Sequence, residues 1–284
     1  MANPLDYNNG EHIVPDGAFR ISPSGIARFF TAPTAWWREN LLGEAGFEGS
    51  TASVLGTCVH YCAERYALTG TLSDEDKQHI EDYIDQESAK NSEVDPDIIR
   101  TQFKIMATNL INEYLIYNHP QEVEPFVVET ILPNIMVGGS IDNITNNIIV
   151  DYKTSSLTKL PDTIKFEYRL QLLTYAWIKR KQGTPIDRIR IVYVSRDKPG
   201  KISDKTGKQL KSYPSQVKVL TENVTQEDFD YIEGIINLIA HSVQLWNEQP
   251  ELRYALAKDW RLHPSQLEQN MPTNKLFIKD NNGN

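Results

Sequence analysis

A short hydrophobic run that ends in charged residues is the segment best suited to chemistry. Ile148–Val150 predicts a buried β-strand, and Asp151 and Lys153 follow it. Because successive side chains of a strand point to opposite faces, Asp151 and Lys153 share one face. A carboxylate can hold a divalent cation, and an ammonium beside it can position or help deprotonate water and offset phosphate charge. The pair therefore indicates a hydrolytic metal site.

An acid, any residue and a lysine form a common tripeptide. Chance should supply it about once or twice in a chain of this length. The sequence holds a second copy, Glu75–Lys77, in a polar helical stretch where the two charges do not share a strand face. A plain salt bridge at the end of a strand is the alternative interpretation of Asp151 and Lys153.

A second carboxylate, Asp142, closes the segment Gly139–Asp142, nine residues before Asp151. The turn Asn146–Asn147 predicts antiparallel strands, which can bring Asp142 beside Asp151. Two adjacent carboxylates repel each other unless a cation lies between them. Asp142 is therefore a candidate metal ligand, with a turn-capping role as the alternative.

Two helical pairs accompany the carboxylates. His60 and Glu64 are four residues apart on a predicted helix and share a face, as do Gln171 and Tyr175 on a later helix. Each pair has an ordinary structural explanation, because a lone helical histidine is usually a core or surface residue. The pair Gln171 and Tyr175 is likewise ordinarily a helix surface of no catalytic meaning.

The rest of the sequence predicts the elements that position these side chains. Helical spacing of apolar residues dominates the first 120 residues, and β-branched, alternating patterns follow. The predicted helices are Ile26–Phe30, Pro33–Leu42, Thr51–Leu68, Ser73–Ala89, Asp95–Tyr117, Phe166–Lys181 and Gln226–Glu248. The predicted strands are Val123–Ile135, Val137–Ile144, Asn147–Tyr152, Arg188–Arg196 and Gln216–Leu220. This order predicts an α/β core with a mixed sheet and an N-terminal helical layer.

Composition limits the class of protein. The 284 residues are 40% hydrophobic and 24% charged, as is usual for globular proteins. The net charge of −9 argues against electrostatic coating of nucleic acid but is compatible with an enzyme that gathers carboxylates around a metal. No apolar run could span a bilayer, and residues 1–10 show no signal-peptide pattern. We expect a cytoplasmic protein without membrane contact, with Cys58 and Cys62 as reduced thiols; a disulfide between them is the alternative.

The order of the motifs resembles the RecB-type branch of the PD-(D/E)XK nuclease superfamily. The motifs are Gly-x-x-x-His ending at His60, Gly-x-x-Asp ending at Asp142, Asp-Tyr-Lys-Thr from Asp151 and Gln-x-x-x-Tyr from Gln171. Each motif is common alone, and their conjunction over about residues 22–196 carries the resemblance. It implies a restriction-endonuclease-like α-β-β-β-α-β core.

The resemblance also implies an activity and residue roles. It implies a metal-dependent DNA nuclease using one or two Mg²⁺ or Mn²⁺ ions, and favours an exonuclease of replication, recombination or repair. The substrate would be single- or double-stranded DNA with a free end. Lys153 would act on the attacking water, and Glu64 and Glu129 would support the ligands, although Glu129 could equally face solvent. The implied ligands are His60, Asp142, Asp151 and the Tyr152 carbonyl, with Gln171 and Tyr175 at the rim of the site.

Many RecB-like nucleases bind an iron–sulfur cluster, and this sequence departs from them. Ala32 precedes Pro33 where those relatives have a cysteine, and no cysteine follows Cys62. Two cysteines cannot supply four thiolates, so a cluster of that type is excluded. The chain is therefore similar to cluster-free members such as phage exonucleases or the mitochondrial genome-maintenance exonuclease.

A basic segment and three aromatic residues are candidate substrate contacts. Asp197–Ser215 carries five lysines and two aspartates, so its local charge is +3, and it predicts a phosphate-contacting loop. A solvated surface hairpin is the alternative. Trp36, Trp37 and Tyr61 could stack on unpaired bases, but a core position is favoured for the two tryptophans. The lysines are Lys198, Lys201, Lys205, Lys208 and Lys211, against Asp197 and Asp204.

We expect residues 1–20 to be flexible, 21–120 to form the helical layer, 121–256 the nuclease core and 257–284 a tail, with 21–256 as one compact unit. Two other functions fit the same motifs. One is a sequence- or structure-specific endonuclease, and the other is a non-catalytic nucleic-acid-binding module of the same fold. The intact set of Asp142, Asp151 and Lys153 argues against the non-catalytic module.

Overall fold

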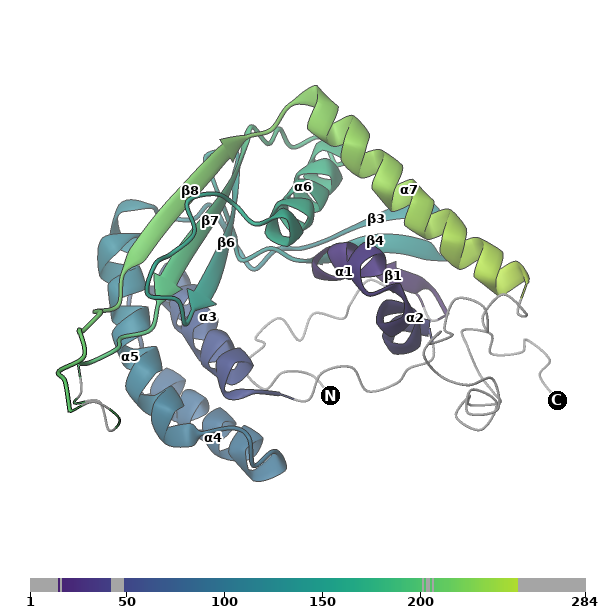
Figure 1. The fold of residues 1–284 in the computed structure, drawn as a ribbon. Coiled ribbons are helices and arrows are strands. Elements are labelled where there is room, and N and C mark those ends of the chain that lie inside the picture. The colour runs from purple at the N-terminus through teal and green to yellow at the C-terminus, as the bar shows by residue number, and fades with distance from the viewer. Residues whose placement is uncertain are drawn as a thin grey trace, which may run out of the picture.

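The computed structural model describes residues 15, 17–41, 49–200, 202, 205 and 207–249, which form a mixed α/β fold (Figure 1). The helices are α1 (Ile26–Thr31), α2 (Pro33–Leu41), α3 (Thr51–Thr69), α4 (Asp74–Lys90), α5 (Pro96–Glu113), α6 (Phe166–Lys181) and α7 (Gln226–Glu248), with 3-10 turns η1 (Pro23–Gly25) and η2 (Leu115–Tyr117). The strands are β1 (Phe19–Ile21), β2 (Glu122–Val123), β3 (Phe126–Leu132), β4 (Ile135–Ser140), β5 (Asn143–Thr145), β6 (Ile148–Ser155), β7 (Arg188–Ser195) and β8 (Val217–Asn223). No helix in the described part of the chain is long and apolar enough to cross a membrane.

The central sheet has five strands in the order β2-β5-β6-β7-β8. β6 and β7 are parallel, and the other neighbouring strands are antiparallel. A parallel pair needs a long crossover, which α6 supplies between β6 and β7. A second sheet has the order β1-β4-β3. The mixed sheet and the α-β-β-β-α-β order predicted from the sequence are confirmed.

The first two predicted strands of the core, Val123–Ile135 and Val137–Ile144, are wrong as single strands. Each divides in two, into β2 with β3 and into β4 with β5. At the division Glu124 has a φ of 48° and Pro125 has no N–H to donate, so a regular ladder cannot continue. The Glu124 N–H still donates to the Asp142 carbonyl at 3.1 Å. The paired strands therefore bend from one sheet into the other beside Asp142.

Side chains of β6 alternate between two hydrophobic clusters. Ile149 packs in the cluster that includes residues of α1, α2, α6 and α7, whereas Val150 and Tyr152 pack in the cluster formed with α3, α4 and α5. Figure 1 shows α3 and α5 on one side of the central sheet and α6 on the other. Burial of both faces explains why the strand sequence is continuously apolar up to Asp151.

Helix α3 begins and ends at residues that favour helix termini. Ser50 caps the start by accepting a hydrogen bond from the Ser53 N–H, and Gly70, with a φ of 74°, ends it. Cys58 and Cys62 are free thiols buried on its inner face. Burial raises the pKa of Cys62 to about 12, so this thiol stays protonated and unreactive at neutral pH.

Two expectations about the N-terminal part require correction, namely flexibility up to residue 20 and base stacking by Tyr61, whereas the core position favoured for Trp36 and Trp37 is confirmed. Phe19 is 5% exposed and lies in β1, so the predicted flexible segment cannot extend to residue 20. Trp36, Trp37 and Tyr61 are each at most 2% exposed. They belong to the core and cannot stack on bases. Residues 1–14 and the predicted tail, 257–284, lie outside the described residues.

Asp76, in the first turn of α4, accepts hydrogen bonds from α3, the helix that carries His60. Its Oδ1 accepts hydrogen bonds from Arg65 Nε at 2.7 Å and the Tyr61 hydroxyl at 3.1 Å, and its Oδ2 accepts from the N–H and hydroxyl of Ser73. Burial alone would raise the pKa of Asp76, but these donors lower it to about 2. The folded protein therefore binds the Asp76 proton more weakly than the unfolded chain does.

We expect Asp76→Asn to lower the free energy of unfolding by about 2 kcal/mol at pH 7. Because the folded pKa lies below the ordinary value of 3.8, the stabilisation is present above pH 4 and is lost as the pH falls towards 2. Urea unfolding at pH 7, 5 and 3 would measure the free energy of unfolding of both proteins. We expect the difference between wild type and Asp76→Asn to be smaller at pH 3 than at pH 7. Asp74→Asn is the control, because that side chain is 99% exposed in the same helical turn. A difference in free energy of unfolding that does not change with pH would contradict the stabilising role of the ionised Asp76.

Candidate active site

Asp151 and Lys153 lie together on the face of β6 that meets α6. Lys153 Nζ is 2.8 Å from Oδ1 and 2.7 Å from Oδ2 of Asp151, and 5.1 Å from the centre of the Tyr168 ring. Asp151 Oδ1 also accepts a hydrogen bond from Gln171 Nε2 at 3.2 Å. The Asp151 side chain is 6% exposed and that of Lys153 is 21% exposed. Lys153 is therefore the more solvent-exposed residue of a largely buried pair.

Asp142 immediately precedes β5, and its charge acts on Asp151, whose pKa it helps to raise. Its Oδ2 accepts a hydrogen bond from the Tyr152 N–H at 2.6 Å and lies 3.3 Å from His60 Nδ1. The imidazole of His60 also packs edge-on against the Tyr152 ring, with 5.9 Å between ring centres. Residues from α3, the β4–β5 bend, β6 and α6 thus meet in one place.

Burial and neighbouring charges set the protonation of these groups. Burial raises the pKa of Asp151 to about 6, with Lys153 opposing the rise and Asp142 adding to it. Burial would also raise the pKa of Asp142, but His60 and Lys153 hold it below its ordinary value. Burial would lower the pKa of both bases, yet Asp142 raises that of His60, and Asp151 with Asp142 raises that of Lys153. At neutral pH two carboxylates therefore face a permanent ammonium and an imidazole hydrogen-bonded to Asp142.

The glycines of two motifs allow elements to approach closely. A Cβ at Gly139 would lie 3.0 Å from the Tyr175 hydroxyl, and a Cβ at Gly56 would lie 3.4 Å from the Thr154 hydroxyl. These contacts bring α6 against β4 and α3 against β6. Tyr175 is 5% exposed and hydrogen-bonded to Gln171. Tyr175 therefore supports Gln171 from within the core.

The two acids predicted to support the metal ligands, Glu64 and Glu129, lie on α3 and β3. Glu64 is one turn beyond His60 on α3 and is half-buried. Glu129 pairs with Val137 in β3–β4, well along the strand from the bend. The acid at the bend is Glu124, whose N–H bonds to the Asp142 carbonyl and which the sequence analysis missed. Its signal was the proline that follows it, because a proline inside a strand pattern predicts an interruption.

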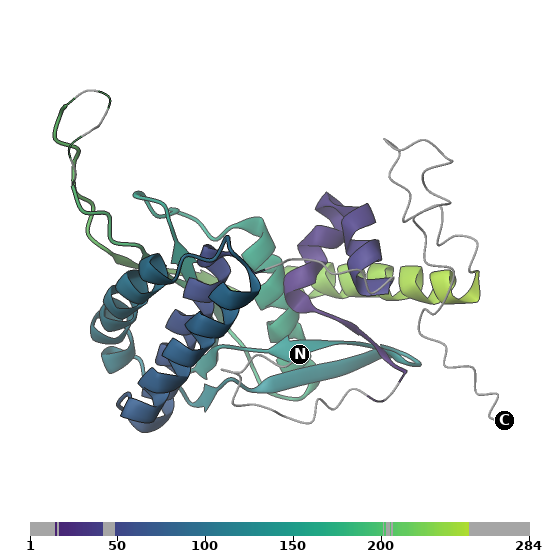
Figure 2. The same cartoon turned by 90° about the horizontal axis from the view of Figure 1, so that it is seen from below.

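The basic segment between β7 and β8 forms an arm that projects from the sheet (Figure 2). Lys198 bridges to Tyr213 and Ile202 to Gln209, so its two sides pair as a ribbon. Among its predicted contacts Lys198, Lys205, Lys208 and Lys211 are exposed, while Lys201 lies outside the described residues. Of the arm lysines that the structure describes, none is bonded to Asp142, Asp151 or His60.

The donors of the cluster suit a divalent cation. Two carboxylates, an imidazole and the backbone carbonyl of Tyr152 are donor types that Mg²⁺ and Mn²⁺ accept. Asp151 Oδ2 is buried and, although Lys153 is near it, accepts no aligned hydrogen bond. Within the described ranges no three such groups already surround one point. The donor types therefore fit a divalent cation, and in this structure Asp151 bonds to Lys153 and Asp142 contacts His60.

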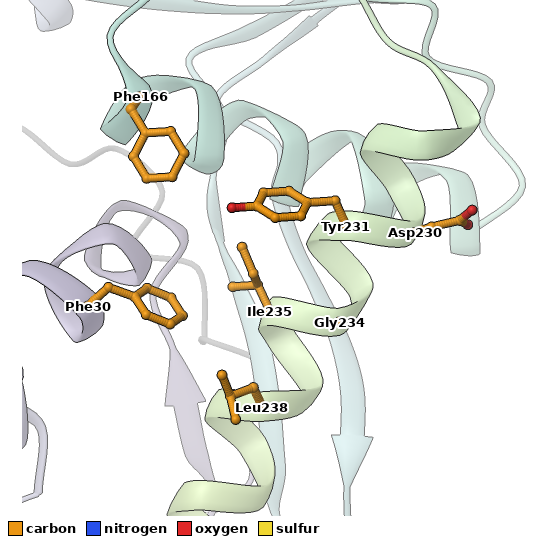
Figure 3. Close-up of a pocket in the computed structure, with 7 residues that line it drawn as sticks. All are labelled: Phe30, Phe166, Asp230, Tyr231, Gly234, Ile235 and Leu238. Carbon is orange, nitrogen blue, oxygen red and sulfur yellow. The ribbon is translucent and has the colours of Figure 1, made fainter.

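An apolar groove lies apart from the cluster, between α1, α7 and the first turn of α6 (Figure 3). Its volume is about 580 Å³, and Figure 3 shows Asp230 pointing away from the rings. Neither Asp142 nor Asp151 lines the groove, so this apolar opening and the candidate chemistry are in different places. It is lined by Phe30, Phe166, Asp230, Tyr231, Gly234, Ile235 and Leu238.

Comparison with known proteins assigns the family. The model of the PD-(D/E)XK nuclease superfamily matches residues 20–248, and the chain belongs to this superfamily. It is thus a nuclease, of a class that hydrolyses phosphodiester bonds and generally uses divalent metal ions. No curated protein is significantly similar to the chain.

Solved structures share the fold. A provisionally named exonuclease from Eubacterium rectale has a TM-score of 0.51 and 14% identity, covering 91% of this chain and 90% of its own. The alkaline exonuclease LHK-Exo from Laribacter hongkongensis has a TM-score of 0.35 and 11% identity over 68% of this chain and 92% of its own. At these identities the likeness to the Eubacterium rectale protein shows the fold alone.

Proposed function

We propose that this chain is a divalent-metal-dependent DNA exonuclease of the RecB-like branch, acting in the cytoplasm in DNA replication, recombination or repair. The observation that carries the proposal is the meeting of Asp142, bonded to the Tyr152 N–H at 2.6 Å, with the pair of Asp151 and Lys153, bonded at 2.7–2.8 Å. The structural neighbour from Eubacterium rectale, provisionally named an exonuclease and covered over 90% of its own chain, supports the choice of exonuclease. The substrate would be single- or double-stranded DNA with a free end.

Asp142, Asp151, His60 and the Tyr152 carbonyl would hold one or two Mg²⁺ or Mn²⁺ ions. A bound divalent ion supplies Lewis acidity and lowers the pKa of water, so that hydroxide is available at neutral pH. The Tyr152 N–H fixes the Asp142 carboxylate at 2.6 Å, and Gln171 fixes Asp151 at 3.2 Å. These two bonds hold the carboxylates in place against the scissile phosphate.

Lys153 would position the attacking water and offset the charge of the phosphate. Its pKa is raised because Asp151 and Asp142 outweigh the effect of burial, so Lys153 is an ammonium at working pH. An ammonium donates hydrogen bonds and does not accept a proton. Of the two roles considered from the sequence, this protonation state favours positioning over deprotonation. Gln171, held by Tyr175, would border the substrate strand.

The exposed lysines of the arm would bind phosphates without reading sequence. We expect the double substitution Lys205→Ala and Lys208→Ala to reduce the slope of log Kd against log salt by about 2 for double-stranded DNA, because each lost phosphate contact removes about 0.9. Fluorescence anisotropy in EDTA, which prevents cleavage, would measure the slope. Lys77→Ala on α4 is the control. An unchanged slope in the double variant would show that the arm does not contact DNA.

The test of the proposed function is digestion of end-labelled linear and of circular DNA with Mg²⁺ or Mn²⁺. An exonuclease digests single- or double-stranded linear DNA progressively and leaves circles intact. Products of defined length from a circle would instead identify an endonuclease. Failure to cleave ssDNA, dsDNA or RNA with Mn²⁺, combined with retained binding, would identify a non-catalytic nucleic-acid-binding module. Chelation by EDTA should stop all cleavage.

A further inference from the structure

Helix α6 contacts both residues of the Asp151 and Lys153 pair from one of its faces. Gln171 donates a hydrogen bond to Asp151 Oδ1 at 3.2 Å, and Lys153 Nζ lies over the ring of Tyr168, 5.1 Å from its centre. Tyr168 and Gln171 are three residues apart on the helix, so they are neighbours on its surface. The same face of α6 therefore meets the carboxylate with an amide and the ammonium with an aromatic ring.

The Tyr168 ring is packed against a buried neighbour, Tyr193 of β7. The two ring centres are 6.4 Å apart with an interplanar angle of 55°, and Tyr193 is 2% exposed. Tyr193 pairs with Lys153 in the parallel register of β6 and β7, so these two side chains leave the sheet on the same face. Tyr168 is half-buried against the hydrophobic cluster that includes Tyr193. This packing leaves the Tyr168 ring little freedom to turn away from Lys153.

The ammonium of Lys153 needs more than one contact to fix its direction. It carries three N–H groups on a flexible stem, and one of them bonds Asp151 Oδ1 at 2.8 Å. A single hydrogen bond does not determine where the other N–H groups point. The face of an aromatic ring attracts a cation within about 6 Å of its centre, and most strongly where water is excluded. The Lys153 side chain is 21% exposed, so its contact with Tyr168 lies in a largely buried place.

We propose that Tyr168 is a positioning residue for Lys153. The face of its ring holds the ammonium so that the N–H groups not bonded to Asp151 point at the attacking water and the scissile phosphate. This inference rests on the role proposed for Lys153 and adds a residue outside the four motifs. Lys165 also lies near the ring, at 5.8 Å, but in an exposed position, where the same attraction is weaker.

The test compares Tyr168→Leu with Tyr168→Phe in single-turnover cleavage of end-labelled DNA with saturating Mn²⁺. We expect Tyr168→Leu to lower the rate about tenfold, the effect of losing a cation–π contact in a largely buried site. Tyr168→Phe keeps the ring and should restore most of the rate. The Kd for DNA in EDTA should not change in either variant, because the ring orients Lys153 and does not bind DNA. Phe166→Leu is the matched control: this aromatic residue of the same helical turn is 52% exposed, and its variant should cleave as the wild type does.

A double-mutant cycle with Lys153→Met separates positioning from packing. Lys153→Met keeps the side-chain stem without the ammonium, so adding Tyr168→Leu should not lower its residual rate further. The same cycle is measured by thermal unfolding of the metal-free protein. Tyr168→Leu should lower the thermal midpoint more in the wild type than in Lys153→Met, because only the wild type loses a cation–π contact. A ring that serves packing alone would lower both midpoints equally.

The outcomes distinguish the role of Tyr168 from the proposed function. Equal falls of the midpoint in the two backgrounds, or a Tyr168→Phe variant as slow as Tyr168→Leu, would overturn the inference. If Lys153→Ala is inactive while Tyr168→Leu cleaves as the wild type does, Tyr168 does not position Lys153, and the proposed function stands. If Lys153→Ala cleaves at the wild-type rate, the role proposed for Lys153 fails, and this inference fails with it.

Discussion

Replacing Lys153 with alanine is expected to lower the rate of DNA cleavage by about 10³-fold, the effect of removing a positioned donor from a desolvated site. Lys153 is the ammonium that bonds Asp151, and its 21% exposure makes it the group of the pair that substrate can reach. Single-turnover digestion of end-labelled DNA with saturating Mn²⁺ would measure the change. Asp151→Ala should abolish cleavage altogether, because it removes a carboxylate from the cation site.

The controls for this prediction address folding and general charge. Removing Lys153 leaves Asp151 without its counter-charge, so thermal midpoints must be compared with Mn²⁺ present. Lys153→Met retains the packing of the side-chain stem and should be as inactive as the alanine variant. Lys165→Ala removes another lysine beside Tyr168, 5.8 Å from the ring centre, and should retain activity within about tenfold. Wild-type rates in folded Lys153→Ala would refute the catalytic assignment.

Gly138→Ala is expected to have the largest effect on stability among the glycine substitutions. Its Cβ would lie 2.3 Å from the Val127 carbonyl oxygen and 2.8 Å from the Val128 Cα. Both are backbone atoms of the paired strand β3, so β3 and β4 must separate to admit the methyl group. Overpacking against backbone should cost about 3 kcal/mol of the free energy of unfolding, or a thermal midpoint about 6–10 °C lower.

Gly234→Ala and Gly139→Ala are the comparison variants for Gly138→Ala. Gly234 lies in α7 with nothing within 4 Å of a Cβ, so alanine there should stabilise the protein by about 0.5–1 kcal/mol. Gly139→Ala meets only the end of a side chain, the Tyr175 hydroxyl at 3.0 Å, and should affect activity more than stability. Calorimetric melting of all three variants measures the differences between their thermal midpoints. Equal midpoints for Gly138→Ala and Gly234→Ala would show that the strands accommodate the methyl group.

Predictions that depend on local patterns matched the structure closely. The helix predicted at Phe166–Lys181 has the same bounds in the structure, and that at Gln226–Glu248 does too. Thr225 caps the start of α7, and a change of periodicity marks the bounds of both helices; these signals are local in sequence. The strand that carries Asp151 and Lys153 followed from the apolar run before them, and the arrangement of the two charged side chains on one face needed no tertiary information.

Features that depend on contacts between distant segments were not determined by the sequence. The bend at Glu124 divides two strands because a left-handed residue and a proline together interrupt a ladder whose other side is 18 residues away. The core positions of Trp36 and Trp37 depend on α7, about 200 residues later in the chain.

For the candidate site, the sequence by itself determined residue types and order: an Asp-x-Lys strand end, an earlier aspartate, and flanking helices with His60 and Gln171. Only the tertiary structure decided which groups touch. It paired His60 with Asp142 and Lys153 with Asp151, buried Tyr175, and placed Glu124 rather than Glu129 beside Asp142. The physical reason is that contacts across strands depend on register and backbone twist, which the periodicity of one segment does not encode.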